Sequence, residues 1–104
     1  MISIFREDDL NNIPALYSQD GKGSDATVYL KVQIPFTGYV WLITEYSPEE
    51  EIFFGFVCLN DIEMSELGYI SKQELEDLGR KYPLTIEKME MNLAEAKITY
   101  ILGE

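Results

Sequence analysis

The sequence contains no histidine and a single cysteine, Cys58. Zinc sites built from thiolates and imidazoles need several such side chains, and catalytic groups of the Cys-His or Ser-His-Asp type need a histidine base. These metal sites and these nucleophilic mechanisms are therefore excluded. We expect a protein that is not an enzyme, has no catalytic residues, and uses neither a metal nor another cofactor.

Basic residues are also scarce. The chain has 8 lysines and arginines against 19 aspartates and glutamates, which gives a net charge of −11 at pH 7 and a pI of about 4.3. A field of this sign repels nucleic-acid phosphates and anionic lipid headgroups. We expect no direct binding to nucleic acid and no binding to a membrane.

Long apolar runs are missing. The longest, residues 40–43 and 52–59, are far shorter than the roughly 20 residues of a membrane-spanning helix, and residues 1–9 lack the pattern of a secretory signal. Cys58 lies within an apolar run, which favours a buried, inert thiol. These patterns predict a cytoplasmic protein.

The chain has enough apolar residues for one core. Of the 104 residues, 46% are hydrophobic and 12% aromatic. This composition is too apolar for a disordered chain, and the length suits one compact unit. We expect residues 1–104 to form a single domain.

Strand-like segments predict an α+β fold with an antiparallel β-meander of four to five strands. Residues 27–34 alternate with a period of two, residues 39–46 are β-branched or aromatic almost throughout, and residues 52–59 form a third run. Gly55 in the third run indicates a bulge or a close packing contact. Residues 67–70 are a candidate fourth strand.

One main helix is predicted over about residues 71–81. Ser71 and Glu74 have the spacing of a capping box, and Pro83 ends the helix. A short N-terminal helix is predicted over residues 6–12.

The C-terminal part is less regular. Residues 84–91 are compatible with a strand or with a second helix. Residues 97–102 are rich in β-formers, and we expect them to pair with the sheet after a short helical turn at residues 92–96.

Residues 20–25 contain two glycines and one lysine. A phosphate-binding loop of the Walker type would be followed by a helix, whereas a strand follows here, and Lys22 stands where a calcium loop needs a third oxygen ligand. The segment is interpreted as an ordinary flexible loop.

Carboxylates gather on the predicted turns and helix starts. Three interpretations stay open: a solvated face, a negative surface that binds a partner, and a site at which two facing carboxylates hold a metal or catalyse a reaction. Pro48 pins one turn, so the acids after it face water. For the partner surface, the candidates are Glu49, Glu50, Glu51, Asp61, Glu63, Glu74 and Asp77.

Glu45 ends an otherwise apolar strand. The period of two places it on the same face as Trp41 and Ile43, where a carboxylate either lies at the wet rim of the sheet or pairs with a tyrosine or with Lys31. An alternative ligand cleft at the end of the sheet would be lined by Tyr17, Trp41, Glu45, Glu66 and Tyr69.

Several short segments stand out together in one order along the chain. They are Ile13-Pro14-Ala15-Leu16-Tyr17, Gly21-Lys22-Gly23 with Asp25, Thr44-Glu45, Phe53-Phe54-Gly55, Glu66-Leu67-Gly68-Tyr69 and Glu74-Leu75. In these segments the chain resembles a small bacterial domain family of unknown function. The resemblance covers roughly residues 10–80 and weakens after Pro83. It implies no reaction, cofactor or catalytic residue, but it implies carriage on plasmids, integrative elements and phages, often near antirestriction genes.

Two functions follow as hypotheses. In the first, the chain is a non-enzymatic interaction protein of a mobile element or phage that binds a host protein and blocks a nucleic-acid site by presenting carboxylates where phosphates would lie. In the second, it is a module that binds a nucleotide or metabolite in the cleft. An exposed strand edge would allow a dimer, but no residue pattern specifies an oligomeric state.

Overall fold

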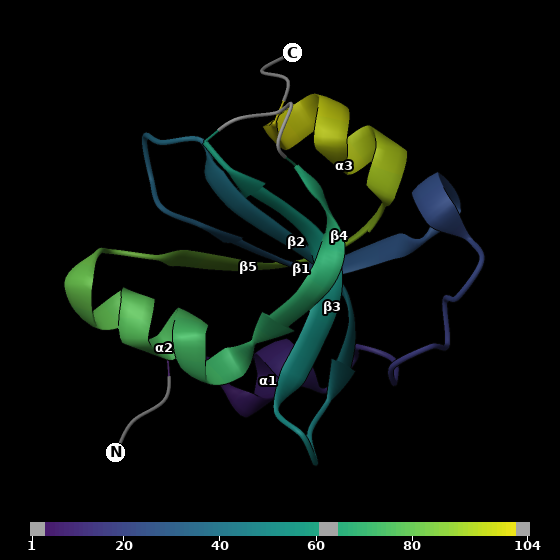
Figure 1. The fold of residues 1–104 in the computed structure, drawn as a ribbon, viewed down its shortest axis with the longest axis horizontal. Coiled ribbons are helices and arrows are strands. Elements are labelled where there is room, and N and C mark those ends of the chain that lie inside the picture. Colours follow the sequence, from purple (N-terminus) through teal and green to yellow (C-terminus); the bar gives the residue numbers. More distant parts are fainter. Residues whose placement is uncertain (1–3, 61–64, 102–104) are drawn as a thin grey trace.

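A five-stranded antiparallel sheet forms the centre of the molecule in the computed structural model, which describes residues 4–60 and 65–101 (Figure 1). The strand order is β4-β3-β2-β1-β5, so the chain forms a meander through four strands and then crosses to the opposite edge. The strands are β1 (Thr27–Gln33), β2 (Tyr39–Ser47), β3 (Ile52–Leu59), β4 (Glu66–Ser71) and β5 (Thr85–Asn92).

Helices cover both faces of this sheet. α1 (Glu7–Leu10) and α2 (Lys72–Lys81) lie on one side and α3 (Leu93–Tyr100) lies on the other (Figure 1). A single 3-10 turn, η1 (Gly23–Asp25), precedes β1. In the part of the chain that the structure describes, no helix is long and apolar enough to cross a membrane.

The predicted α+β fold is confirmed, with a fourth and a fifth strand completing the sheet. The main helix begins where the capping pattern places it, because the Ser71 hydroxyl accepts a hydrogen bond of 3.1 Å from the Glu74 amide. The short N-terminal helix is α1. Residues 84–91, which the sequence left open, contribute β5 rather than a second helix.

The prediction of a strand over residues 97–102 is wrong. Residues up to Tyr100 form α3, and the helical turn predicted over residues 92–96 is its beginning. The Asn92 side chain caps it by accepting a hydrogen bond of 2.9 Å from the Ala94 amide. β5 occupies the edge beside β1, and Leu93 and Ala96 bury the apolar face of β1, β2 and β3 under α3, so packing on that face overrides local β-propensity.

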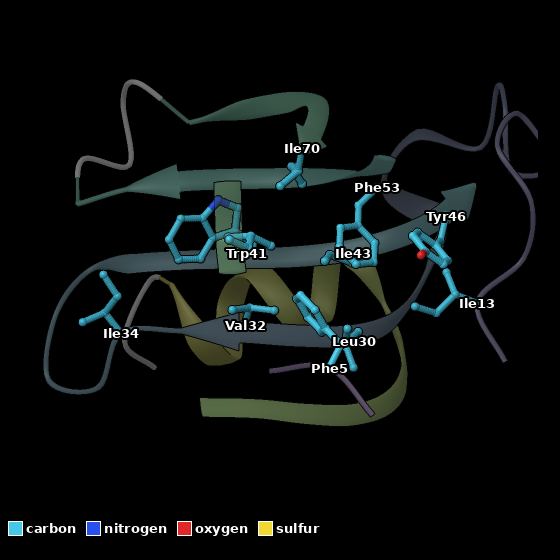
Figure 2. Close-up of a cluster of buried hydrophobic side chains, with 11 residues drawn as sticks. Phe5, Ile13, Leu30, Val32, Ile34, Trp41, Ile43, Tyr46, Phe53 and Ile70 are labelled. Carbon is cyan, nitrogen blue, oxygen red and sulfur yellow. The ribbon is translucent and has the colours of Figure 1, made fainter. Parts of the chain in front are cut away.

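Each face of the sheet carries its own apolar cluster. The first is shown in Figure 2 with α3 behind the sheet, and it includes Trp41, Ile43 and Phe53. The second lies under α3, where Leu93 and Ala96 pack on β1, β2 and β3. Cys58 belongs to the second cluster and is a buried free thiol, as predicted. Burying one large apolar side chain contributes about 1.5–3 kcal/mol, so both faces stabilise the sheet.

β2 contains one residue more than the part of β3 beside it. Ile43 pairs with Gly55 and Glu45 pairs with Phe54, so Thr44 is the inserted residue of a β-bulge. After the bulge the alternation reverses, and Tyr46 joins Ile43 in the first cluster. Glu45 therefore points to the opposite face, and the prediction that it shares a face with Trp41 and Ile43 is wrong.

Gly55 lies directly against this bulge. A Cβ atom on Gly55 would come 2.1 Å from the Leu42 carbonyl oxygen and 2.8 Å from the Ile43 Cα, both far inside van der Waals contact. The predicted bulge or close contact at Gly55 is therefore confirmed, with the inserted residue in the neighbouring strand.

A pair of glycine substitutions tests this packing. Gly68 is the register partner of Gly55 in β4 and has open space around its Cβ position. We expect Gly55→Ala to lower the free energy of unfolding by about 3 kcal/mol, because the β2 backbone must shift. Gly68→Ala should change it by less than about 1 kcal/mol. Urea denaturation measures both, and equal effects would contradict the contact.

Candidate functional site

The turn between β2 and β3 carries three exposed acids. Glu49, Glu50 and Glu51 follow Pro48, and we call residues 48–51 the acidic turn. Its end is tied to the start of α2, because the Lys72 amide donates a 3.1 Å hydrogen bond to the Glu51 carbonyl. The Lys72 ammonium also lies 3.9 Å from the Glu51 carboxylate and 3.2 Å from that of Glu76. Glu49 and Glu50 are left facing solvent.

The other predicted partner-binding acids occupy different positions. Glu74 and Asp77 are exposed on α2, where Asp77 pairs with Arg80 and accepts a 2.9 Å hydrogen bond from the Gln73 amide group. Asp61 and Glu63 lie outside the described residues. Among the candidates that the structure describes, Glu51 of the acidic turn is joined to the first turn of α2 through Lys72.

Four of the eight basic side chains form ion pairs within the molecule. Lys31 pairs with Glu87 at 3.3 Å, and Lys88 pairs with Asp8 at 3.0 Å, in addition to the pairs of Lys72 and Arg80. Within residues 4–60 and 65–101, many exposed carboxylates form no ion pair. They are Glu7, Asp20, Asp25, Glu49, Glu50, Glu66, Glu74, Glu90 and Glu95.

Glu45 lies neither at the wet rim of the sheet nor beside Lys31, the two positions considered from the sequence. Its side chain is buried, with 4% of the residue exposed. One carboxylate oxygen accepts a 2.8 Å hydrogen bond from the Tyr17 amide, and the other accepts a 2.8 Å bond from the Gln19 amide. Lys31 is instead paired with Glu87. The wet-rim and lysine-pair interpretations are wrong, and the tyrosine that contacts Glu45 does so through its backbone.

Gln19 reinforces the same contact. Its side-chain amide donates to the Thr27 carbonyl at 2.9 Å and to the Thr44 carbonyl at 2.8 Å, and its oxygen accepts from the Thr27 amide at 2.7 Å. Gln19 therefore joins the loop before β1 to the start of β1 and to the bulge in β2. Sequence reasoning missed it, because a lone glutamine in a polar loop carries no recognisable pattern.

Tyr17 is held in an unusual backbone conformation. Its φ is 72°, in the left-handed region that a bulky residue adopts only at a cost of about 1–3 kcal/mol. The hydrogen bond from its amide to Glu45 offsets that cost, and 64% of the residue stays exposed. Glu45 thus positions the Tyr17 ring at the surface.

Tyr17 and Tyr69 meet on the β3–β4 side of the α3 face. The pKa of Tyr69 is raised, first by the neighbouring Tyr17 side chain, then by burial, and then by the negative charges of Glu45 and Asp20. The Tyr69 ring also packs edge-on against Phe54, with centroids 5.1 Å apart. An aromatic surface with a negative potential results.

A pocket of about 340 Å³ adjoins the two tyrosines. Asp20, Glu45, Phe54 and Leu67 contribute to its wall, together with Gln19, Gly21, Gly23, Ala26 and Thr44. We call the pocket and the two tyrosines the tyrosine cleft. Of the predicted cleft residues, the structure brings Tyr17, Glu45 and Tyr69 together. Residues from four of the segments that carry the family resemblance line the pocket: Gly21 and Gly23, Thr44 and Glu45, Phe54, and Leu67.

Two predicted cleft residues lie elsewhere. Trp41 is buried in the first cluster and lines a separate apolar pocket of about 360 Å³ with Tyr39, Leu59 and Tyr82. Glu66 is exposed three residues before Tyr69 on β4, so alternation turns its side chain to the opposite face. Sequence reasoning instead missed Asp20, Phe54 and Leu67, although the last two lie within the quoted motifs.

No metal centre is formed by the described residues, where no three Cys, Asp or Glu side chains are placed to hold a metal ion together. The tyrosine cleft offers a ligand aromatic rings, carboxylates and backbone groups.

Comparison with known proteins gives one match. A family model described as "Protein of unknown function (DUF2958)" matches residues 7–102. The match includes β5 and α3 and so extends well beyond residue 80, where the resemblance noted in the sequence weakens. No curated protein and no solved structure matches the chain.

The amide contacts of Glu45 can be tested by an isosteric change. In Glu45→Gln, an NH₂ group replaces one acceptor and faces an amide N–H, so we expect a loss of about 1–3 kcal/mol in the free energy of unfolding. Hydrogen exchange of the Tyr17 and Gln19 amides should accelerate. Glu66→Gln, at an exposed position, is the control. An unchanged exchange rate in Glu45→Gln would show that the carboxylate does not hold the loop.

Proposed function

Because the chain belongs to the DUF2958 family, which carries no known function, we propose a function from its surface: a non-enzymatic interaction protein that binds a basic surface of another protein. The single observation that supports the proposal is that exposed acids without an ion pair outnumber the unpaired bases in the described residues. Four of the eight bases, Lys31, Lys72, Arg80 and Lys88, pair with acids of the same chain, whereas Glu49, Glu50 and other exposed acids have no paired cation within the described residues.

Exposed carboxylates in this excess attract a partner of opposite charge. Protein surfaces that are strongly basic are commonly those that bind nucleic-acid phosphates. Carboxylates on a rigid turn would occupy the positions of phosphates on such a surface. The partner that we propose is therefore a nucleic-acid-handling protein of the host, and the benefit to a mobile element or phage is inhibition of that protein.

The acidic turn is the proposed centre of this contact. Glu49 and Glu50 protrude from a turn whose backbone is fixed by Pro48 and by the Lys72 hydrogen bond, so little ordering entropy is lost on binding. Exposed charges interact over about 8–10 Å at physiological ionic strength, which makes the contact sensitive to salt.

The double variant Glu49→Lys/Glu50→Lys tests the proposal and leaves the Glu51–Lys72 pair intact. We expect its partner affinity to fall at least about tenfold, with the free energy of unfolding within about 1 kcal/mol of the parent. The measurement is affinity capture from a host lysate at low and raised salt, followed by titration of the captured protein.

The matched control is Glu90→Lys/Glu95→Lys, which changes the net charge equally at exposed positions on β5 and α3. It should retain most of the affinity. If both double variants lost the same affinity for the partner, net charge rather than the acidic turn would explain the binding. Absence of any nucleic-acid-handling protein from the captured material would refute the proposal.

A second candidate function, a small-ligand module, is favoured by the tyrosine cleft. A free ligand at a hundred times its Kd would add about 2.7 kcal/mol of stability. Thermal shift with nucleotides and cationic metabolites checks this function. We expect no stabilisation by nucleotides, because Asp20 and Glu45 lie at the cleft; stabilisation by a nucleotide would contradict the negative character of the site.

A further inference from the structure

The tyrosine cleft occupies the part of the sheet that α3 leaves open. Leu93 and Ala96 of α3 are buried in the second cluster, whereas Leu67 and Tyr69 on β4 remain 43% and 59% exposed. With Tyr17, they form an apolar and aromatic surface around the pocket. Exposed aromatic side chains of this kind contribute most of the binding energy in many interfaces.

Negative charge surrounds these rings. Asp20 is exposed at the pocket wall without an ion pair, and the Glu45 carboxylate has accepted one amide N–H on each oxygen. Each of its oxygens has a second lone pair, since a carboxylate accepts about four hydrogen bonds. The charges that act on Tyr69 from Glu45 and Asp20 have the same sign. Lys22 is exposed between the pocket-lining Gly21 and Gly23 and adds one positive charge, so the two carboxylates leave the site net negative and favour a cation over an anion.

The cleft and the acidic turn lie at the same end of the sheet. The loop that contains Tyr17 and Asp20 precedes β1, and the acidic turn follows β2. β1 and β2 are antiparallel, so the start of one strand is beside the end of the other. One partner surface can therefore contact both.

We propose that the tyrosine cleft binds an arginine side chain of the basic partner, with the guanidinium against the exposed faces of the Tyr17 and Tyr69 rings and beside the Asp20 carboxylate. This inference rests on the proposed function and names the specific contact within it. A guanidinium is planar, stacks on aromatic faces and donates two parallel hydrogen bonds to a carboxylate, which a lysine ammonium cannot do. A pocket of about 340 Å³ accommodates one such side chain.

The construction of the site fits this ligand. The Glu45 hydrogen bond holds Tyr17 in its left-handed conformation, so the ring is positioned before the partner arrives. Gly21 and Gly23 at the pocket wall have positive φ and open space around their Cβ positions. An arginine can enter without displacing a side chain at either position.

The experiment uses isotope-labelled full-length protein and two peptides of equal length, one of alternating arginine and glycine and one of alternating lysine and glycine. NMR follows the Tyr17, Asp20 and Tyr69 amides and the tyrosine ring carbons during titration. We expect the arginine peptide to shift these resonances, to bind more tightly than the lysine peptide, and to lower the pKa of Tyr69, because a cation beside a phenol stabilises its ionised form.

Variants locate the contact. Tyr69→Ala and Asp20→Asn should each weaken the arginine peptide at least about tenfold, and Tyr69→Phe, which keeps the ring, should weaken it less. Tyr82→Ala and Glu95→Gln remove an exposed tyrosine and an exposed charge away from the cleft and should have no effect. Far-UV circular dichroism confirms that each variant is folded.

The outcomes separate this inference from the proposed function. Peptide binding that is lost in Glu49→Lys/Glu50→Lys but unchanged in Tyr69→Ala and Asp20→Asn would overturn the arginine site and leave the acidic interface standing. Absence of any shift at the cleft would overturn it as well. Equal affinity for free acetyl-arginine methylamide would show a small-molecule guanidinium site in place of a partner contact.

Discussion

The Glu45 carboxylate, buried and bonded to the Tyr17 and Gln19 amides, is the contact on which the proposed site depends. An ionised carboxylate away from water is costly unless hydrogen bonds replace its hydration. The two backbone donors supply those bonds and in return give the loop before β1 a fixed position. Without them, the left-handed Tyr17 would have no local compensation, and its ring would not be held beside Tyr69.

That contact exists because of the bulge in β2. One inserted residue, Thr44, rotates Glu45 away from the first cluster and toward the loop. The insertion presses the β2 backbone against β3, and the glycine at position 55 is what makes room for it. The bulge between β2 and β3 thus determines, through the Glu45 carboxylate, how the loop that carries Tyr17 is placed at the surface. Bulges often redirect a side chain in this manner.

The surface of the described residues carries a net negative charge. The chain has 19 acids against 8 bases, and ion pairs such as Lys31–Glu87 and Lys72–Glu76 engage four of those bases, so carboxylates outnumber cations among the charges left unpaired in the described residues. Exposed acids of one sign repel each other and destabilise the compact state slightly, and a cationic partner would relieve that repulsion. In the proposed complex, the acidic turn would supply charge, and the tyrosine cleft would supply aromatic surface for one side chain of the partner.

The sequence by itself determined the elements whose signals are local. Period-two alternation in β1, the Ser71 cap of α2 and the net charge each depend on neighbouring residues or on composition alone, and each was predictable. Tertiary structure decided the rest. Residues of β-forming type after Lys97 became helical because an open sheet face, and not an edge, needed cover. Glu45 changed faces because a bulge is a relation between two strands, and Gln19 and Asp20 joined the site through contacts with residues distant in the chain, which no local pattern encodes.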